Sequence, residues 1–212
     1  MSVHLSPEQI EAESFRIIEE ELGPHDWSAQ QWPIVRRAIH TSADFDYAKS
    51  MYIAPNAIAS GIAALKAGYG IVTDTTMIIS GMGKERIKQF GVLASCYVAD
   101  AQVARDAKAQ LITRSILAMR KGGRDPKNGI FVIGNAPTAL FELIRLIREE
   151  RLVPQLIVAL PVGFVGAAES KEALRALAKD YPGLPFITNS GRKGGSNVAA
   201  AVMNAILIQA GA

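Results

Sequence analysis

Two arginines and a histidine lie close together in an otherwise apolar stretch of this sequence. Arg36, Arg37 and His40 fall within residues 32–44, which we expect to form a helix. At about 3.6 residues per turn, His40 lies one turn beyond both arginines and shares their sector of the helix. Guanidinium groups hold carboxylates or phosphates by charge-assisted hydrogen bonds, and an imidazole can give or take a proton near neutral pH. The spacing therefore predicts an anion site with a proton donor beside it.

A plainer interpretation of this cluster is a solvated basic helix end. Cations near a helix C-terminus interact favourably with the helix dipole, and such clusters often do nothing more. Trp27 and Ser28 precede the stretch, and Ser28 is the expected N-cap of the helix. The local pattern leaves both interpretations open.

A first helix is expected over residues 7–22. Ser6 and Gln9 have the pattern of a capping box, and a Gly-Pro pair at residues 23–24 ends the helix. Its apolar stripe consists of Ile10, Ile17, Ile18 and Leu22. Ser14 interrupts this stripe. Such a serine either donates to the backbone carbonyl one turn back or points into a ligand pocket.

Short apolar runs, each followed by a turn and a helical stretch, repeat along the chain. The expected strands cover residues 51–53, 70–73, 91–95, 129–133, 154–160 and 184–188. The expected helices between and after them cover residues 54–65, 100–109, 113–121, 139–150, 168–179 and 197–209. This alternation is typical of right-handed βαβ units. We therefore predict an α/β fold in one domain over residues 1–212, with three layers in the order αβα. In this fold a mainly parallel sheet is covered by helices on both faces, and a helical segment at the N-terminus precedes it.

Polar side chains gather directly after two of these strands. One group is Thr73, Asp74 and Thr75; the other, in a glycine-rich loop, is Asn189, Ser190, Arg192 and Lys193. The carboxyl ends of parallel strands meet at one edge of a sheet, where ligands of α/β proteins bind. These residues are therefore predicted to bind an acidic ligand, although the second group could equally be a solvated loop.

A turn at residues 134–139 could hold a phosphate at a helix N-terminus. It lacks the glycine spacing of the dinucleotide fingerprint and of the P-loop. Nucleotide binding is therefore not the favoured interpretation.

Composition excludes several classes of function. The 212 residues are 49% hydrophobic and 20% charged, as in an ordinary globular domain. A net charge of +3, without a dense basic stripe, argues against nucleic-acid binding. One cysteine and three histidines argue against a disulfide or a metal site. The N-terminus lacks a signal-peptide pattern and no apolar window reaches about 18 residues, so we expect a cytoplasmic protein without membrane association.

Three motifs carry a family resemblance: IEAESFR at residues 10–16, IVRRAIHTSADF at residues 34–45 and NSGRKGGS at residues 189–196. In this order they resemble the precorrin-8X methylmutase family, also called cobalt-precorrin-8 methylmutase, and the similarity runs nearly end to end. The resemblance implies an isomerase of cobalamin biosynthesis that moves a methyl group from C-11 to C-12 of a tetrapyrrole, giving hydrogenobyrinic or cobyrinic acid. It implies no cofactor.

The resemblance also implies roles for individual residues. His40 would be the general acid, and Ser14 would contact the substrate, a tetrapyrrole polycarboxylate. Arg36, Arg37 and the 189–196 loop would surround its acidic arms. Family members are usually homodimers. Two alternatives stay open, namely a non-catalytic corrinoid-binding protein and an α/β enzyme acting on a phosphorylated metabolite; whether the substrate carries cobalt also stays open.

Overall fold

A mixed sheet lies at the centre of the molecule. The structure, a computed structural model, describes residues 6–212. In this range the sheet has six strands in the order β1-β6-β5-β4-β2-β3. They are β1 (Met51–Ile53), β2 (Gly70–Thr73), β3 (Ala94–Cys96), β4 (Asn128–Ile133), β5 (Leu156–Ala159) and β6 (Phe186–Asn189). All neighbouring pairs are parallel except β1 with β6, so the predicted mainly parallel sheet is confirmed.

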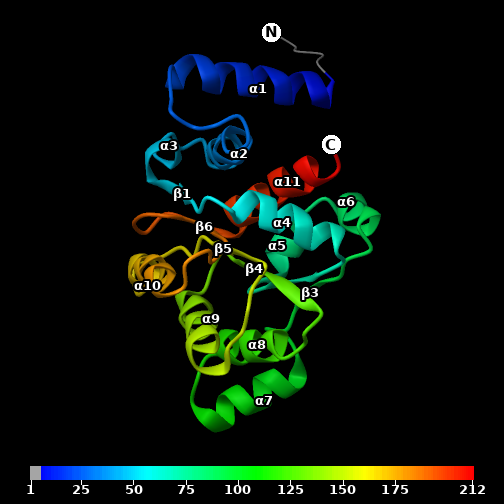
Figure 1. The fold of residues 1–212 in the computed structure, drawn as a ribbon, viewed down its shortest axis with the longest axis vertical. Helices are drawn as coiled ribbons and strands as arrows, with labels where there is room; N and C mark the ends of the chain where they lie inside the picture. The colour runs from blue at the N-terminus through cyan, green and yellow to red at the C-terminus, as the bar shows by residue number, and fades with distance from the viewer. Residues whose placement is uncertain (1–5) are drawn as a thin grey trace.

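Helices cover the sheet on both sides. They are α1 (Pro7–Leu22), α2 (Trp32–Ser42), α3 (Tyr47–Ser50), α4 (Ala57–Lys66), α5 (Thr76–Gly81), α6 (Lys84–Gln89), α7 (Ala101–Gln110), α8 (Arg114–Gly123), α9 (Pro137–Glu150), α10 (Ala167–Asp180) and α11 (Ser196–Ala210). Figure 1 shows α4 and α11 on one side of the sheet and α8, α9 and α10 on the other. Beyond α11 lies α2, and α1 forms the outermost element at that end. The predicted αβα layering is therefore confirmed.

Sequence periodicity located most elements, with errors at their ends. The third strand begins at Ala94 rather than at residue 91, and α3 and α6 were not predicted. These two helices have four and six residues, too few for an apolar period of about 3.6 to show. The capping box of α1 is present, since Ser6 Oγ accepts from Gln9 N–H and Gln9 Oε1 from Ser6 N–H.

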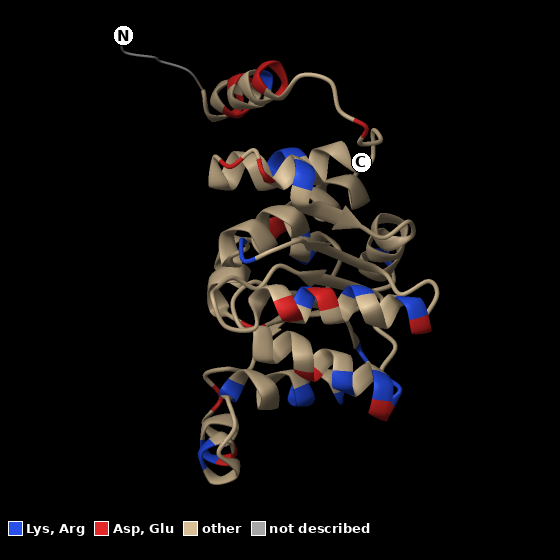
Figure 2. Cartoon of the chain, turned by 90° about the vertical axis from the view of Figure 1, so that its left-hand side faces the viewer, with Lys and Arg blue, Asp and Glu red and all other residues tan. Residues whose placement is uncertain are grey.

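The core follows from the central strands. Every residue of β5, and every residue of β4 after Asn128, is buried. Strands covered on both faces need such continuous apolar runs rather than an alternating pattern. Charged residues, by contrast, are spread along the outer helices, where Figure 2 shows positive and negative side chains mixed.

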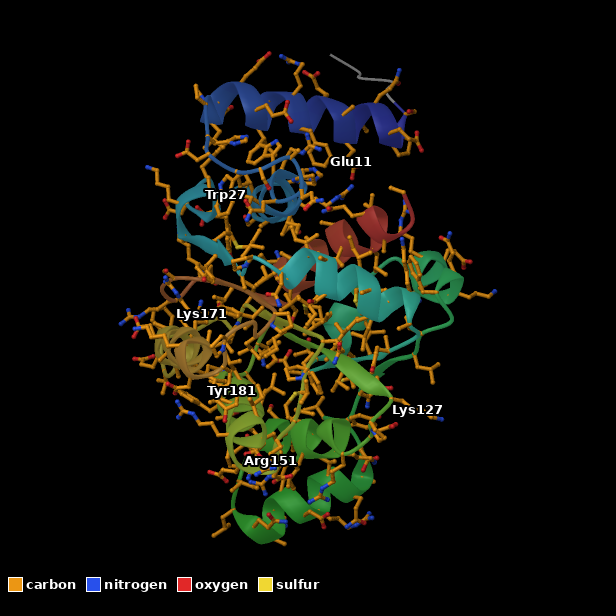
Figure 3. The ribbon with its side chains drawn as sticks, viewed as in Figure 1. Glu11, Trp27, Lys127, Arg151, Lys171 and Tyr181 are labelled. Carbon is orange, nitrogen blue, oxygen red and sulfur yellow. The ribbon has the colours of Figure 1, made fainter. Side chains whose placement is uncertain are left out.

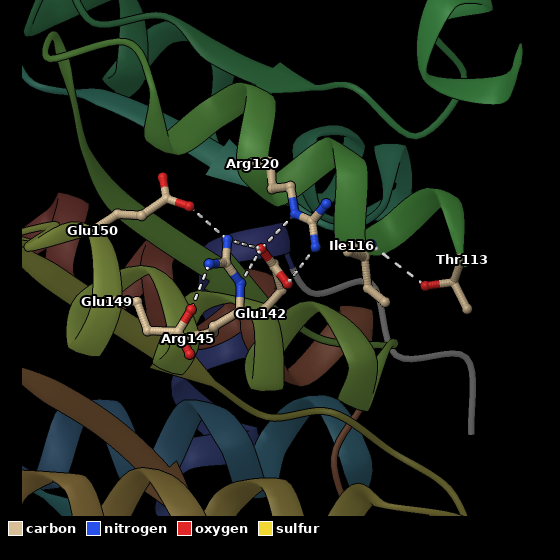
Figure 4. Close-up of polar contacts among 7 residues, drawn as sticks. All are labelled: Thr113, Ile116, Arg120, Glu142, Arg145, Glu149 and Glu150. Atoms are coloured by element: carbon tan, nitrogen blue, oxygen red, sulfur yellow. Dashed lines mark hydrogen bonds and ion pairs between the residues drawn. The ribbon is translucent and has the colours of Figure 1, made fainter. Parts of the chain in front are cut away.

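A charged cluster joins α8 to α9. Glu142, with 5% of its side chain exposed, accepts hydrogen bonds from Arg120 Nε at 2.7 Å and Arg145 Nη2 at 2.6 Å (Figure 4). Arg145 also pairs with Glu149 at 2.9 Å and Glu150 at 2.7 Å. Burial opposes the charge on Glu142, but hydrogen bonds from Arg145 and Arg120 outweigh it and lower the pKa of this carboxyl. The two hydrogen bonds from Arg120 of α8 to Glu142 of α9 therefore tie these helices together.

Candidate active site

Helix α2 carries the predicted arginine–histidine cluster. Its buried side chains, packed toward α11 and the core, are Ile34, Val35, Ala38 and Ile39. On the opposite side Arg36 and Arg37 are half-buried, while His40 is exposed. The N-cap is Gln31, so the prediction of Ser28 was wrong. Ser28 instead closes the turn before the helix, where its Oγ accepts from Gln31 N–H at 3.3 Å.

Phe15 of α1 brings the three side chains of this cluster together. The guanidinium carbons of Arg36 and Arg37 lie 4.0 Å and 5.3 Å from the centroid of the Phe15 ring. The His40 ring meets the same phenyl ring edge to face, with centroids 5.2 Å apart. Cations over an aromatic face are attracted by its quadrupole. Sequence reasoning missed Phe15, whose only signal was its place next to Ser14 in the first motif.

Both arginines are paired with carboxylates of α1. Arg37 donates through both terminal nitrogens to Glu11, at 3.0 Å and 3.1 Å. Arg36 donates to Glu19, which also accepts from Trp32 Nε1 at 3.3 Å. The hydrogen bond from Arg36 lowers the pKa of Glu19. The site predicted to hold ligand carboxylates therefore already holds two carboxylates of the protein.

A cavity of about 420 Å³ opens beside His40. Its lining consists of Glu11, Arg37, His40, Thr41, Gly81, Asn197, Ala200, Ala201 and Asn204. Both ends of the Asn204 amide are engaged, since its oxygen accepts from Gly83 N–H at 2.8 Å and its nitrogen donates to Gly81 O at 2.9 Å. Asn197 makes only a long hydrogen bond, 3.4 Å, to Thr41 O. Sequence reasoning missed both asparagines, although polar residues on the apolar helix α11 were a usable signal.

The Ser14 hydroxyl makes the backbone hydrogen bond that was one of its two predicted roles. Its Oγ donates to Ile10 O at 2.8 Å, one turn back along α1. It does not belong to the residues that line the cavity. Figure 3 shows that Glu11, on the same helix, lies on the side of α1 that faces α2.

Asp74 lies at the carboxyl edge of the sheet but is buried, with 1% of its surface exposed. Its carboxylate accepts from the backbone N–H groups of Gly134 at 3.0 Å, Asn135 at 2.9 Å and Ala136 at 2.6 Å. Burial raises the pKa of Asp74, and the three hydrogen bonds oppose this effect. The turn that could have held a phosphate is thus filled by a protein carboxylate. The geometry favours neither ligand binding by Asp74 nor a phosphate at this turn.

The two threonines beside Asp74 join the end of β2 to the start of α11. Thr73 is fully buried and its Oγ1 donates to Thr75 O at 2.9 Å. Thr75 Oγ1 and Ser196 Oγ share a hydrogen bond of 2.9 Å. These hydroxyls therefore stabilise the carboxyl edge of the sheet, and Thr75 is half-buried whereas Thr73 is buried.

A buried lysine holds the 189–196 loop through two hydrogen bonds. Lys171, 1% exposed, donates to Asn189 Oδ1 at 3.0 Å and Lys193 O at 2.7 Å. The side chain of Lys193 reaches Asp44 at 2.7 Å and Asp46 at 2.5 Å, just after the helix that carries His40. The loop and the cluster on α2 are therefore connected. Lys171 was not predicted from the sequence, because a lysine in a helical stretch gives no sign that it is buried.

Ser190 and Arg192 are exposed residues of the loop that form no ion pair with the described residues. Ser190 is exposed, and its Oγ accepts a long hydrogen bond, 3.4 Å, from Arg175. Arg192 is exposed, with its guanidinium carbon 5.6 Å from the centroid of the Phe164 ring. These two side chains are free to meet a ligand at the sheet edge. Asn189, fully buried, is not.

Lys171 should make stability depend on pH. Burial lowers its pKa to about 8, whereas the unfolded chain keeps this proton until about pH 10.4. Between these values the unfolded state binds more protons, so stability from this residue rises with pH. Relative to Lys171→Met, the unfolding free energy of the wild type should rise by about 1 kcal/mol from pH 7 to pH 9.

Urea unfolding at both pH values measures this difference. Lys179→Met, an exposed position on the same helix, is the matched control and should show no such change relative to the wild type. Parallel pH dependences of the wild type and Lys171→Met would contradict the prediction.

Two further findings bear on the class of protein. Within residues 6–212 no group of three His, Cys, Asp or Glu side chains could hold a metal ion. In the same range no helix is long and apolar enough to cross a membrane. The fold and the site define an α/β protein in which His40 and Arg37 line a cavity and Arg36 lies beside them over the same phenyl ring.

Similarity to known proteins identifies the family. A family model described as precorrin-8X methylmutase matches residues 9–209. The cobalt-precorrin-8 methylmutase of Priestia megaterium is 52% identical, over 97% of this chain and 89% of that protein. The precorrin-8X methylmutase of Pseudomonas aeruginosa is 39% identical, over 80% of each chain. A crystal structure of the precorrin-8X methylmutase of Thermus thermophilus superposes with a TM-score of 0.85 at 38% identity, covering 95% of both chains. The chain belongs to the precorrin-8X methylmutase family, whose members are isomerases.

Proposed function

We propose that this chain moves a methyl group from C-11 to C-12 of precorrin-8X or cobalt-precorrin-8, giving hydrogenobyrinic or cobyrinic acid. The observation that carries the proposal is the position of His40. It is exposed on α2, lines the cavity and lies beside two arginines, in a chain of the methylmutase family. Cobalamin biosynthesis is the pathway in which such an enzyme acts.

The chemistry asks for one general acid. His40 donates a proton to the conjugated macrocycle, and this protonation assists the migration. The bond from the methyl group to C-11 breaks, the bond to C-12 forms, and the proton returns to His40. Atoms and electrons balance within the substrate, so the reaction consumes no methyl donor, oxidant or reductant.

Binding would use the cations around the cavity. Arg36 and Arg37 receive carboxylate arms of the substrate, and Ser14 contacts it from α1. Ser190, Arg192 and the other members of the 189–196 loop border the sheet edge. Ser190 and Arg192 are both exposed.

We also propose that the working form is a homodimer. The cavity of about 420 Å³ lies toward the lower end of the range for drug-sized ligands, roughly 300–1,000 Å³. A tetrapyrrole with its acidic arms is larger than this cavity. A second copy of the chain would supply the missing walls, as symmetric dimers commonly do at shared sites.

The absorption spectrum tests the proposal. Purified protein is incubated with precorrin-8X and, separately, with cobalt-precorrin-8, and the expected result is conversion of at least one to the corrin spectrum. The form that is converted faster identifies the natural substrate. Binding without spectral change would instead indicate a corrinoid-binding protein. If neither compound binds and phosphate or nucleotide protects against thermal unfolding, an enzyme of phosphorylated metabolites is indicated.

A further inference from the structure

Glu11 stands where a ligand carboxylate would bind. It lines the same cavity as Arg37 and His40, and its two oxygens take both terminal nitrogens of Arg37, at 3.0 Å and 3.1 Å. A bidentate pairing of this kind is the arrangement that a carboxylate ligand makes with an arginine. In the described chain this guanidinium has no other hydrogen-bond acceptor.

The pair is accessible enough to be exchanged. The side chain of Glu11 is 44% exposed and that of Arg37 is 21% exposed. Ion pairs in contact with solvent contribute roughly 0–1 kcal/mol, because water competes for both partners. An incoming carboxylate can therefore replace Glu11 on Arg37 at small cost.

The surroundings of the pair favour a ligand with several carboxylates. Arg36 and Arg37 both lie over the Phe15 ring, so two cations are close together. Glu19 holds Arg36 as Glu11 holds Arg37. A ligand with one carboxylate replaces one ion pair of the protein by another. A ligand with several carboxylates can bind both arginines at once.

Helix α1 is well suited to such an exchange. Ile18 is its only buried residue among those described, and Ile10 and Ile17 are 52% and 41% exposed. Few apolar contacts therefore fix the position of Glu11. Small movements of α1 would release Arg37 without disturbing the core.

We infer that Glu11 is a built-in competitor for the carboxylates of the ligand: it occupies Arg37 in the free protein and is displaced when a flat polycarboxylate enters the cavity. This inference rests on the proposed function for the identity of the natural ligand. It concerns binding only and involves no covalent step.

Mellitate, a benzene ring with six carboxylates, serves as the probe, and calorimetry at low salt measures its affinity. Glu11→Gln removes the competing charge but keeps the shape and one acceptor, so its Kd should fall about two- to fivefold relative to the wild type. Glu13→Gln is the matched control, because Glu13 pairs with Arg16 on α1 and does not line the cavity. Its Kd should match that of the wild type.

A double-mutant cycle localises the effect to Arg37. In an Arg37→Gln background, adding Glu11→Gln should change the Kd for mellitate by less than in the wild type. Unchanged or weaker binding by Glu11→Gln would overturn the inference, and so would failure of both proteins to bind. The readout does not depend on turnover, so an absence of methyl migration would contradict the proposed function without affecting this result.

Discussion

Replacing His40 with alanine should slow formation of the corrin product by about 10²–10⁴-fold, the usual contribution of a general acid. Protonation of the macrocycle would then depend on water. The fold should tolerate the change, because His40 is exposed and its ring meets Phe15 only in an edge-to-face contact. Binding of the product acid should persist, since both arginines remain. Single-turnover absorption measurements and product titrations separate the two effects.

The control for this substitution is His25→Ala. His25 is exposed, lies 4.1 Å from Trp32 between ring centroids, and is outside the cavity beside His40. Its replacement should leave the rate unchanged. The pH–rate profile supplies a second readout, because the limb that reports loss of the proton donor should vanish in His40→Ala. A full rate in His40→Ala would exclude the general-acid role, and a loss of binding alone would make His40 a substrate contact instead.

Replacing Asp74 with alanine should lower the free energy of unfolding by about 2–4 kcal/mol. The substitution leaves three backbone N–H groups without their acceptor, and each unsatisfied buried donor costs about 1–3 kcal/mol. Water entering at the partly exposed end of the turn at residues 134–136 would offset some of this cost. Urea unfolding at pH 7 measures the change.

Asp100→Ala provides the comparison for Asp74. Asp100 also accepts from backbone N–H groups, those of Gln102 at 2.9 Å and Val103 at 3.0 Å, but it does so as a partly exposed N-cap. Its loss should cost about 1–2 kcal/mol, the usual value for a cap together with the exposed ion pair to Lys121. If Asp74→Ala were no more destabilising than Asp100→Ala and instead impaired substrate binding, Asp74 would be a ligand residue as its position in the sequence predicted.

Local patterns predicted much of this molecule because the forces behind them act over a few residues. Apolar periods located the helices around Ile18 and Ile39 and the strands at the centre of the sheet. The βα alternation then required parallel strands and so one shared carboxyl edge. The spacing of Arg36, Arg37 and His40 similarly placed them in one sector of α2, because a helix has a fixed geometry.

Tertiary structure decided which groups pair with these residues. Glu11 and Glu19 reach Arg37 and Arg36 only because α1 packs across α2, a geometry that neither helix encodes alone. The three N–H groups at residues 134–136 meet Asp74 because β2 and β4 are neighbours, although about sixty residues separate them in the chain. The burial of a side chain, its hydrogen-bond partner and its charge state depend on contacts between segments that are distant in the sequence. Secondary structure depends mainly on residues that are near neighbours in the sequence. For this reason the candidate residues could be named from the sequence, but which of them are free for a ligand could not.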